Sequence, residues 1–231
     1  GKADVMIAVG AESVLCPLVI YSLANAKSLS RRNDTPKTAS RPFDITRDGF
    51  VIGEGGGALV IETEAHALAR GAKIYAEIKS CGNTSDAYHV TAPHPEGRGA
   101  IACMKQALSD AKLSPSDIGY INAHGTATNK GDAVEIEAIK NIFTDKLPFV
   151  SSTKGATGHM MGAGGITETI ACIKTIETGI IPPTINLNEV GPECSGVDLV
   201  ANTAKKAEIN YAMSNAFGFG GQNSSVIVGK Y

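Results

Sequence analysis

The sequence predicts a layered α/β fold. Apolar runs of strand length alternate with segments whose apolar residues recur at helical spacing. Apolar residues make up 43% of the 231 residues and are spread along the whole chain. The chain can therefore bury a sizeable core, as one large domain or two small ones. No repeat, low-complexity segment or flexible linker divides it.

The first part of the chain predicts two strands separated by a polar excursion. Residues 3–9 form an unbroken apolar run that is typical of a buried strand. Residues 25–46 are polar and basic and contain two prolines, which predicts a surface excursion. A glycine cluster then leads into a second strand at 58–63. Residues 65–70 predict a short helix that ends at Gly71.

From residue 73 onward strands and helices alternate regularly, and a weak domain boundary falls near residues 71–73. The expected strands lie at 73–81, 118–123, 149–151, 211–215 and 225–228, and the expected helices at 100–111, 132–143 and 165–178. In the last helix the expected buried stripe consists of Ile166, Ile170, Ile173 and Ile176.

Charge and cysteine content narrow the function classes. A net charge of −2 and a pI of about 6.2 give no general argument for binding nucleic acid or a membrane. No apolar run approaches the roughly 18 residues that span a bilayer. The N-terminus does not resemble a signal peptide, since no basic region precedes a small-residue cleavage site. Five dispersed cysteines without a CxxC pair predict a reducing compartment, with neither disulfides nor a metal site.

Two histidines suggest the chemistry. His124 begins the run His-Gly-Thr-Ala-Thr, and His159 ends the run Ser-Ser-Thr-Lys-Gly-Ala-Thr-Gly-His. A neutral imidazole donates a hydrogen bond through one ring nitrogen, so two imidazoles aimed at one carbonyl oxygen can stabilise an enolate. A reaction that forms a carbanion beside a thioester needs this arrangement. We therefore expect both rings to face one cavity.

Charged neighbours bear on this interpretation. Lys154 lies among small and apolar residues, where Glu168 is its natural partner. A nearby ammonium disfavours protonation of a histidine and keeps it a neutral donor. Asp132 is expected to cap the helix that follows His124. The structural alternatives are a strand-end His124, a core His159 and a surface lysine, and these segments alone leave them open.

Two segments predict mobile parts. Residues 215–223 place two phenylalanines among glycines and lack the lysine and hydroxyl of a P-loop, so a gate is favoured over a phosphate site. A tight turn with a packed phenylalanine is the alternative. Residues 86–99 form a long loop with His89 and His94, and loops of this length are often lids.

Taken together, these motifs resemble the decarboxylating β-ketoacyl-acyl carrier protein synthases of the thiolase superfamily, in particular the type II elongating condensing enzymes. Each motif alone is weak, but their order along the chain is specific. The matching runs are 41–44, 47–51, 53–55, 85–89, 124–128, 151–154, 158–159 and 217–221. The resemblance implies a thiolase-like layered αβαβα fold. Residues 1–72 would be the end of its first half, and residues 73–231 its complete second half.

The resemblance also implies roles for matching residues. In this family a cysteine takes the acyl chain as a thioester, malonyl-carrier protein loses carbon dioxide, and the enolate attacks the acyl thioester, without a redox cofactor or metal. The family's roles would fall on His124 and His159 for the enolate, Lys154 with Glu168 and Asp132 in support, and Thr126 and Thr128 for the pantetheine arm. Phe219 would be the gate beside the nucleophile, and residues 86–89 would begin a second loop that moves with it. Two histidines, rather than a histidine and an asparagine, favour the elongating enzymes.

One departure from the family is large. Its nucleophilic cysteine stands at a helix N-terminus, shortly before the strand with which this chain begins, and the helix terminus lowers the thiol pKa. Cys16, in Leu-Cys-Pro, has no matching context. The chain is therefore expected to lack the nucleophile and to be inactive by itself. Gln222 stands where the family commonly has threonine, which is a minor change.

The expected protein is thus a 3-oxoacyl-[acyl-carrier-protein] synthase of fatty acid elongation. Its expected partners are acyl carrier protein, loaded with acyl or malonyl groups, and a second copy in a homodimer, with no nucleic acid or membrane. Arg31 and Arg32 are the candidate docking residues for the acidic carrier protein; a solvated loop is the alternative. The expected location is the cytoplasm in a bacterium, or the mitochondrion or plastid in a eukaryote.

Two rival functions follow from the same resemblance. The first is a non-catalytic, chain-length-factor-like partner of a ketosynthase. The presence of His124, His159 and Lys154 argues against it. The second is a non-decarboxylating thiolase that acts on coenzyme A esters, and the motifs around the same three residues disfavour it.

Overall fold

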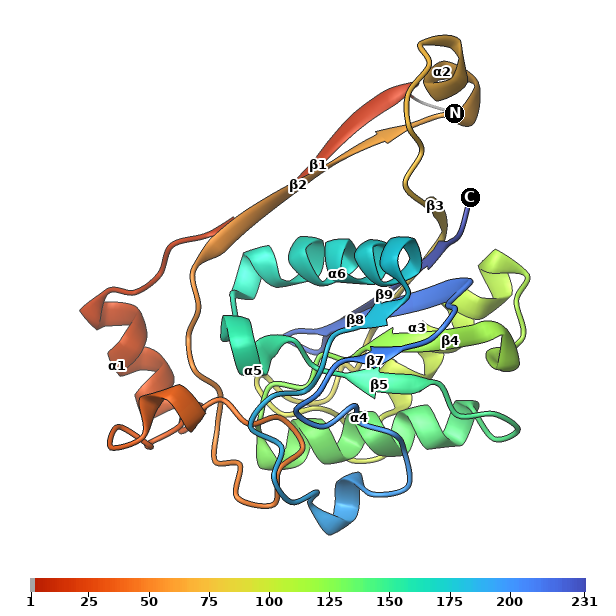
Figure 1. Ribbon diagram of the computed structural model, residues 1–231. Helices are drawn as coiled ribbons and strands as arrows, with labels where there is room; N and C mark the ends of the chain where they lie inside the picture. The colour runs from red at the N-terminus through yellow and green to blue at the C-terminus, as the bar shows by residue number, and fades with distance from the viewer. Residues whose placement is uncertain (1–2) are drawn as a thin grey trace.

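The computed structural model describes residues 3–231, so Gly1 and Lys2, which precede the first expected strand, lie outside the described residues. Its main body is a five-stranded sheet in the order β3-β9-β8-β4-β5 (Figure 1). The strands are β3 (Glu77–Ser85), β4 (Ile118–Asn122), β5 (Phe149–Ser151), β8 (Tyr211–Phe217) and β9 (Gln222–Gly229). Only β9 runs against the others, so the carboxyl ends of β3, β8, β4 and β5 meet at one edge.

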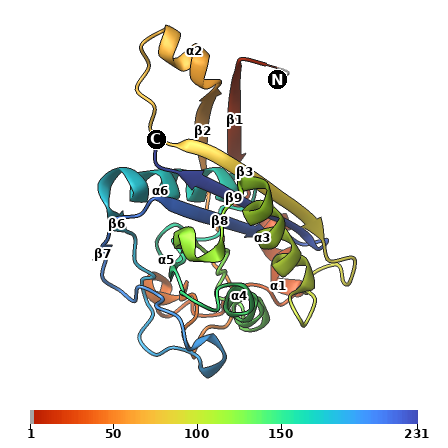
Figure 2. The same cartoon turned by 90° about the vertical axis from the view of Figure 1, so that its right-hand side faces the viewer.

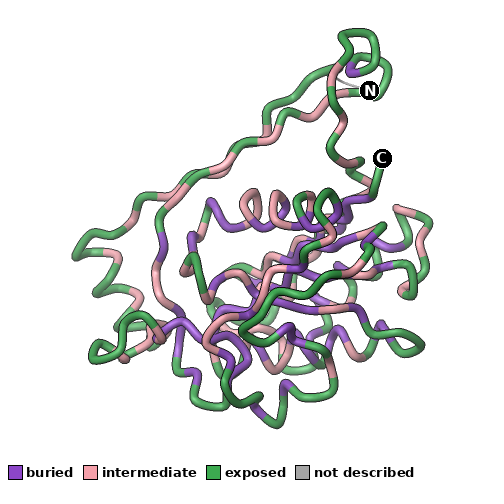
Figure 3. The backbone as a smooth tube through the Cα atoms, in the orientation of Figure 1, coloured by how far each residue is buried: buried purple, intermediate pink, exposed green. Residues whose placement is uncertain are grey.

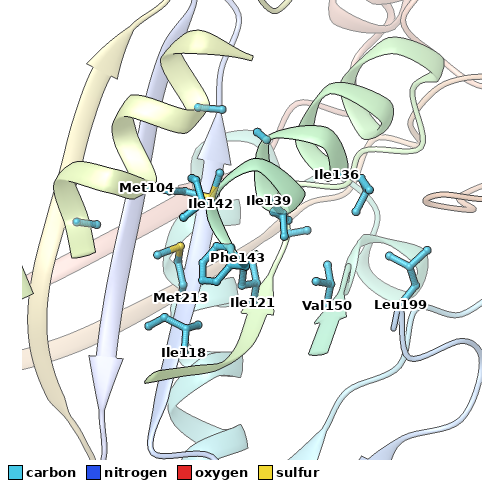
Figure 4. Close-up of a cluster of buried hydrophobic side chains, with 14 of the residues drawn as sticks. Met104, Ile118, Ile121, Ile136, Ile139, Ile142, Phe143, Val150, Leu199 and Met213 are labelled. Atoms are coloured by element: carbon cyan, nitrogen blue, oxygen red, sulfur yellow. The ribbon is translucent and has the colours of Figure 1, made fainter. Parts of the chain in front are cut away.

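Helices cover both faces of this sheet. α6 (Gly164–Thr178) lies on one face, and α3 (Arg98–Ala111) and α4 (Asn129–Ile142) lie on the other (Figure 1, Figure 2). The larger apolar cluster fills the space between the sheet and α3 with α4, and Figure 4 shows Ile136 and Ile139 of α4 in it with Ile121 of β4. A smaller cluster under α6 contains Tyr120 and Cys172. These helices were predicted within a few residues.

A two-stranded antiparallel ribbon projects from this body. β1 (Val5–Glu12) pairs with β2 (Gly55–Glu62), and α1 (Pro17–Asn25) and α2 (Glu64–Ala69) follow at its opposite ends (Figure 1). The prediction of a buried first strand is wrong for this structure, since every residue of β1 is exposed or half-buried (Figure 3). Val9 is 68% exposed. The reason is that, among the described residues, helices contact the ribbon on the side of α6, and the side chains on its other side stay exposed.

α6 lies between the ribbon and the sheet, and this changes which of its faces is buried. Of the four isoleucines in the expected stripe, Ile176 is buried and the other three are half-buried. Ile166 and Ile170 lie against Gly57 of β2, where an added Cβ would meet them at 3.1 and 3.2 Å. The face toward the sheet instead carries Glu168, Thr169, Cys172, Thr175 and Ile176. The layers are therefore ribbon, α6, sheet, and α3 with α4, which confirms the layered α/β class.

The polar segment before β2 also departs from expectation. Residues 25–46 were expected on the surface, but Arg41 and Asp44 are buried, with 8% and 1% exposure. They can be buried because they form an ion pair with each other. Asp44 Oδ1 also accepts hydrogen bonds from the Thr46 backbone and hydroxyl.

The other elements complete the fold. The strand expected at 73–81 begins only at Glu77. The remaining α-helix is α5 (Lys154–Thr157), and the remaining strands are β6 (Ile180–Ile181) and β7 (Lys205–Lys206). Among residues 3–231, no helix has the length and apolar character needed to cross a bilayer.

Candidate active site

The residues singled out in the sequence converge at the edge where the parallel strands end. His124 follows β4, Lys154 follows β5, and the glycine-rich turn joins β8 to β9. Carboxyl ends of parallel strands are the usual position for ligand sites in α/β sheets. A cavity of about 760 Å³ opens here. Its lining includes His124, His159, Thr126, Thr128 and Phe219.

The two histidines meet edge-to-face in the lining of this cavity. Their ring centroids are 5.3 Å apart and the ring planes meet at 85°. Phe50 packs edge-on against His159 with a centroid distance of 5.1 Å, and Phe217 lies 6.0 Å from His124. The backbone of residues 51–53 fixes the position of His159, because His159 N donates to Val51 O and Gly53 N donates to His159 O. The expectation that both rings share one cavity is met.

Both imidazoles are held in the neutral form. Burial, together with the nearby Lys154 ammonium, lowers the pKa of His159 to about 3. Burial, with Lys154 and His159, holds the pKa of His124 well below its usual value. Met161 N donates to His159 Nδ1 at 3.3 Å, so the proton of that neutral ring lies on Nε2. A neutral ring with its proton on Nε2 can donate one hydrogen bond to a ligand oxygen.

Lys154 and Glu168 form the predicted ion pair. Their side chains are 2% and 4% exposed, and Lys154 Nζ donates to Glu168 Oε1. Neither residue lines the cavity, so the pair lies behind the histidines. Burial raises the pKa of Glu168, and the ammonium opposes that rise. The charge of Lys154 therefore acts on the imidazoles through space, while its own charge is balanced.

Glu135 is a site residue that the sequence analysis missed. It is fully buried in α4, and its carboxylate accepts from His124 N at 2.9 Å and from Gly125 N at 2.8 Å. Asn215 Nδ2 donates to it at 3.2 Å. The signal was present in the sequence, since Glu135 is four residues before Ile139 on the buried face of an amphipathic helix. A carboxylate in that position needs hydrogen-bond donors.

The expectation that Asp132 caps α4 is wrong. The helix begins three residues earlier, with Thr128 at the N-cap position, so Asp132 lies inside the first turn. Its Oδ2 accepts from Phe43 N at 2.8 Å and lies 3.7 Å from Arg47 Nε. Burial raises the pKa of Asp132 to about 7. Asp132 thus joins α4 to the polar segment before β2.

The two expected mobile segments contact each other at the cavity mouth. Asp86 accepts from His94 N at 2.9 Å and from Asn223 Nδ2 at 2.8 Å. Gly220 N donates to Val90 O at 2.6 Å, so the loop after β3 and the turn between β8 and β9 are hydrogen-bonded together. Phe219 in that turn is 46% exposed. The hydroxyls of Thr126 and Thr128 are 3.1 Å apart on the cavity wall.

The arginines and cysteines occupy different settings. Arg32 is half-buried; it donates to Thr46 O at 2.6 Å and lies 3.8 Å from Asp48, a cavity-lining residue. Arg31 is exposed.

None of the five cysteines, all within the described residues, lines the cavity. Cys16 and Cys81 are exposed. Cys103, Cys172 and Cys194 are buried, and burial raises the pKa of each thiol. In the part of the chain that the structure describes, no cluster of three or more metal-ligating side chains is found.

Comparison with known proteins places this chain in a family. Residues 1–67 match the family described as "Beta-ketoacyl synthase, N-terminal domain", and residues 75–188 match the family described as "Beta-ketoacyl synthase, C-terminal domain". The 3-oxoacyl-[acyl-carrier-protein] synthase 2 of Vibrio harveyi is 46% identical over 233 residues, covering 100% of this chain and 56% of that protein. A putative mitochondrial 3-oxoacyl-[acyl-carrier-protein] synthase of Schizosaccharomyces pombe is 48% identical over 239 residues, with 100% and 56% coverage.

Solved structures agree with this assignment. A ketosynthase complex described as a type II PKS acyl-carrier protein with its ketosynthase bound to the hexaketide matches with a TM-score of 0.96 and 37% identity. The match covers 100% of this chain and 57% of that one. The chain thus spans about half the length of the curated relatives it matches. On these matches and the shared layered fold, the chain belongs to the β-ketoacyl synthase family.

Proposed function

We propose that this chain supplies the decarboxylating part of the active site of a 3-oxoacyl-[acyl-carrier-protein] synthase that elongates fatty acids. The observation that carries the proposal is the pair of neutral histidines, 5.3 Å apart in one cavity with Lys154 behind them. Two relatives at 46% and 48% identity bear this synthase name. Because the chain covers about half of each relative, the activity is proposed for a complete synthase that contains it.

In the proposed mechanism, the carbonyl oxygen of a malonyl thioester accepts hydrogen bonds from His124 and His159. The bond between the α-carbon and the carboxylate breaks, carbon dioxide leaves, and the electron pair moves into an enolate. Negative charge develops on the thioester oxygen, and two fixed neutral donors stabilise it without reorganisation. The enolate carbon then attacks the acyl thioester carbon, and the cysteine thiolate leaves. Lys154 keeps the imidazoles neutral, and Glu168 balances the lysine.

The remaining cavity residues position the substrate in this proposal. The hydroxyls of Thr126 and Thr128 line the cavity side by side, where they would bind the amides of a pantetheine arm. Phe219, half exposed in a glycine-rich turn, would gate the reaction centre. Glu135 would hold the His124 loop in position through two backbone hydrogen bonds, and Asp132 would join α4 to the segment before β2 by accepting from Phe43 N.

The proposed partner is acyl carrier protein, with Arg32 at the docking surface and a second copy of the synthase in a homodimer. One matching structure is described as an acyl-carrier protein with its ketosynthase, which supports the choice of partner. The relatives include a bacterial enzyme and one described as mitochondrial, so we propose a bacterial cytoplasmic or an organellar location.

The test is the release of carbon dioxide from malonyl-carrier protein by the complete synthase. His124→Ala or His159→Ala should each lower this rate by about 10²–10³, the usual cost of losing one oxyanion donor. Acyl transfer to the cysteine should fall much less. His66→Ala, on α2 and outside the cavity, is the matched control. Equal losses in both half-reactions would show that the histidines serve the fold instead.

A chain-length-factor-like role makes the opposite prediction. Such a protein would leave decarboxylation unchanged when either histidine is replaced. The chain by itself should not form an acyl-enzyme, since none of its cysteines lines the cavity. Mass spectrometry after incubation with acyl-carrier protein would detect one.

A further inference from the structure

The loop that carries the two threonines has an unfavourable backbone conformation. Ala127 has a φ of 65°, in the left-handed region that residues with a Cβ avoid. Phe43, in the polar segment before β2, also has a φ of 65°. Such conformations persist only where surrounding contacts hold them. The loop from His124 to Thr128 therefore depends on its neighbours for its shape.

Three consecutive carbonyl groups, at the end of this loop and the start of α4, are held by one short segment. Gly49 N donates to Ala127 O at 3.0 Å. Arg47 Nε donates to Thr128 O at 3.2 Å, and Arg47 Nη2 donates to Asn129 O at 2.8 Å. One guanidinium thus binds the end of the loop and the first residue of α4 together.

Each nitrogen of the Arg47 guanidinium has a hydrogen-bond acceptor, and two carboxylates lie close to it. Its side chain is 1% exposed, and its Nη1 donates to Asp44 O at 3.1 Å. Asp132 lies 3.7 Å from Nε, and Glu193 accepts from Nη2. The planar fork of arginine donates in several directions at once, which a lysine ammonium on a flexible stem does not reproduce.

We propose that Arg47 is a positioning residue that holds Thr126 and Thr128 in place for the pantetheine arm of the substrate. This inference rests on the proposed function. His159 is held separately, through residues 51–53, and Lys154 is held by Glu168. Loss of the Arg47 fork should therefore weaken binding of the arm more than it slows bond breaking.

The experiment compares Arg47→Lys with Arg41→Lys in the complete synthase. Arg41 is a matched control, since it is also a buried arginine of the same segment. Its guanidinium contacts Thr38 O, Thr46 Oγ1 and Asp44 Oδ1, all outside the threonine loop. Both variants should lower the melting temperature. Only Arg47→Lys should raise KM for malonyl-carrier protein, by about tenfold, the factor that one buried hydrogen bond contributes.

The separate effects on kcat and KM test the positioning role of Arg47 directly. We expect kcat of Arg47→Lys to stay within about twofold of wild type, since uniform binding is lost and the chemical step is kept. KM for malonyl-pantetheine without carrier protein should rise equally, because the loop binds the arm. An unchanged KM, or an equal rise in Arg41→Lys, would overturn the role of Arg47.

A milder variant tests the proposal even if Arg47→Lys does not fold. Glu193→Gln removes one carboxylate that fixes Nη2 and leaves the guanidinium in place. It should raise KM in the same direction by a smaller factor, and an unchanged KM would contradict the proposal if Arg47→Lys does not fold. Failure of wild-type synthase to release carbon dioxide would instead reject the proposed function.

Discussion

The five-stranded sheet and the β1–β2 ribbon show opposite relations between residue type and burial. At the edge of the sheet, Lys154 is buried to 2% exposure beside Glu168. In the ribbon, Val9 is 68% exposed although its strand is almost entirely apolar. The difference shows that burial depends on the layers stacked on an element. Charges are tolerated inside where each has a partner, and apolar residues stay outside where no layer covers them.

The buried ion pair gives the largest expected effect. Lys154→Met leaves Glu168 buried without its cation, and removing one partner of such a pair costs about 3–5 kcal/mol of stability. Replacing both, as Lys154→Met with Glu168→Leu, should cost less because no charge remains buried alone. Urea denaturation of the complete synthase and both variants measures this. A single variant as stable as the double variant would contradict the argument.

The contrast between sheet and ribbon can be tested with two matched isoleucines. Ile139→Ala removes a fully buried side chain of α4 and should cost about 2–5 kcal/mol. Ile7→Ala removes a side chain that is 65% exposed in β1 and should change stability by about 0.5 kcal/mol or less. Denaturation of this chain provides the measurement. Equal losses would show that the ribbon is covered in solution.

The buried histidines predict a pH dependence of stability. The pKa of His159 falls from 6.5 to about 3 in the folded state, so the unfolded chain binds a proton in that window and the native state does not. Stability therefore falls as pH drops below about 6.5, by about 1.4 kcal/mol per pH unit for this group. His159→Gln should remove that part of the slope between pH 6 and 4. An unchanged slope would mean that the ring is protonated in the native state.

The smallest effect on catalysis is expected at the mouth of the cavity. Arg32→Glu should raise KM for acyl-carrier protein by about fivefold or less, the range of an exposed charge pair, with kcat nearly unchanged. The preference should weaken with salt, since screening acts beyond roughly 8–10 Å. Lys37→Glu, an exposed residue that does not line the cavity, is the control. Unchanged kinetics at low salt would exclude Arg32 from docking.

The local pattern of the sequence predicted the elements and part of the site. α3, α4 and β4 follow from apolar periodicity and strand-length runs, which are properties of neighbouring residues. The shared cavity of His124 and His159 follows because two neutral imidazoles that bind one carbonyl oxygen must face the same space. The partnership of Lys154 with Glu168 follows from the cost of burying a lone charge.

Only the tertiary structure decided which faces those elements bury. The sequence by itself determined that β1 is an apolar strand and α6 an amphipathic helix; the stacking of ribbon, helix and sheet decided that β1 is exposed and that Glu168 lies on the inner face of α6. Glu135 and Arg47 hold the His124 loop through contacts between residues about 10 and 80 positions apart. Pairings over such distances depend on how the layers meet, which no local periodicity contains.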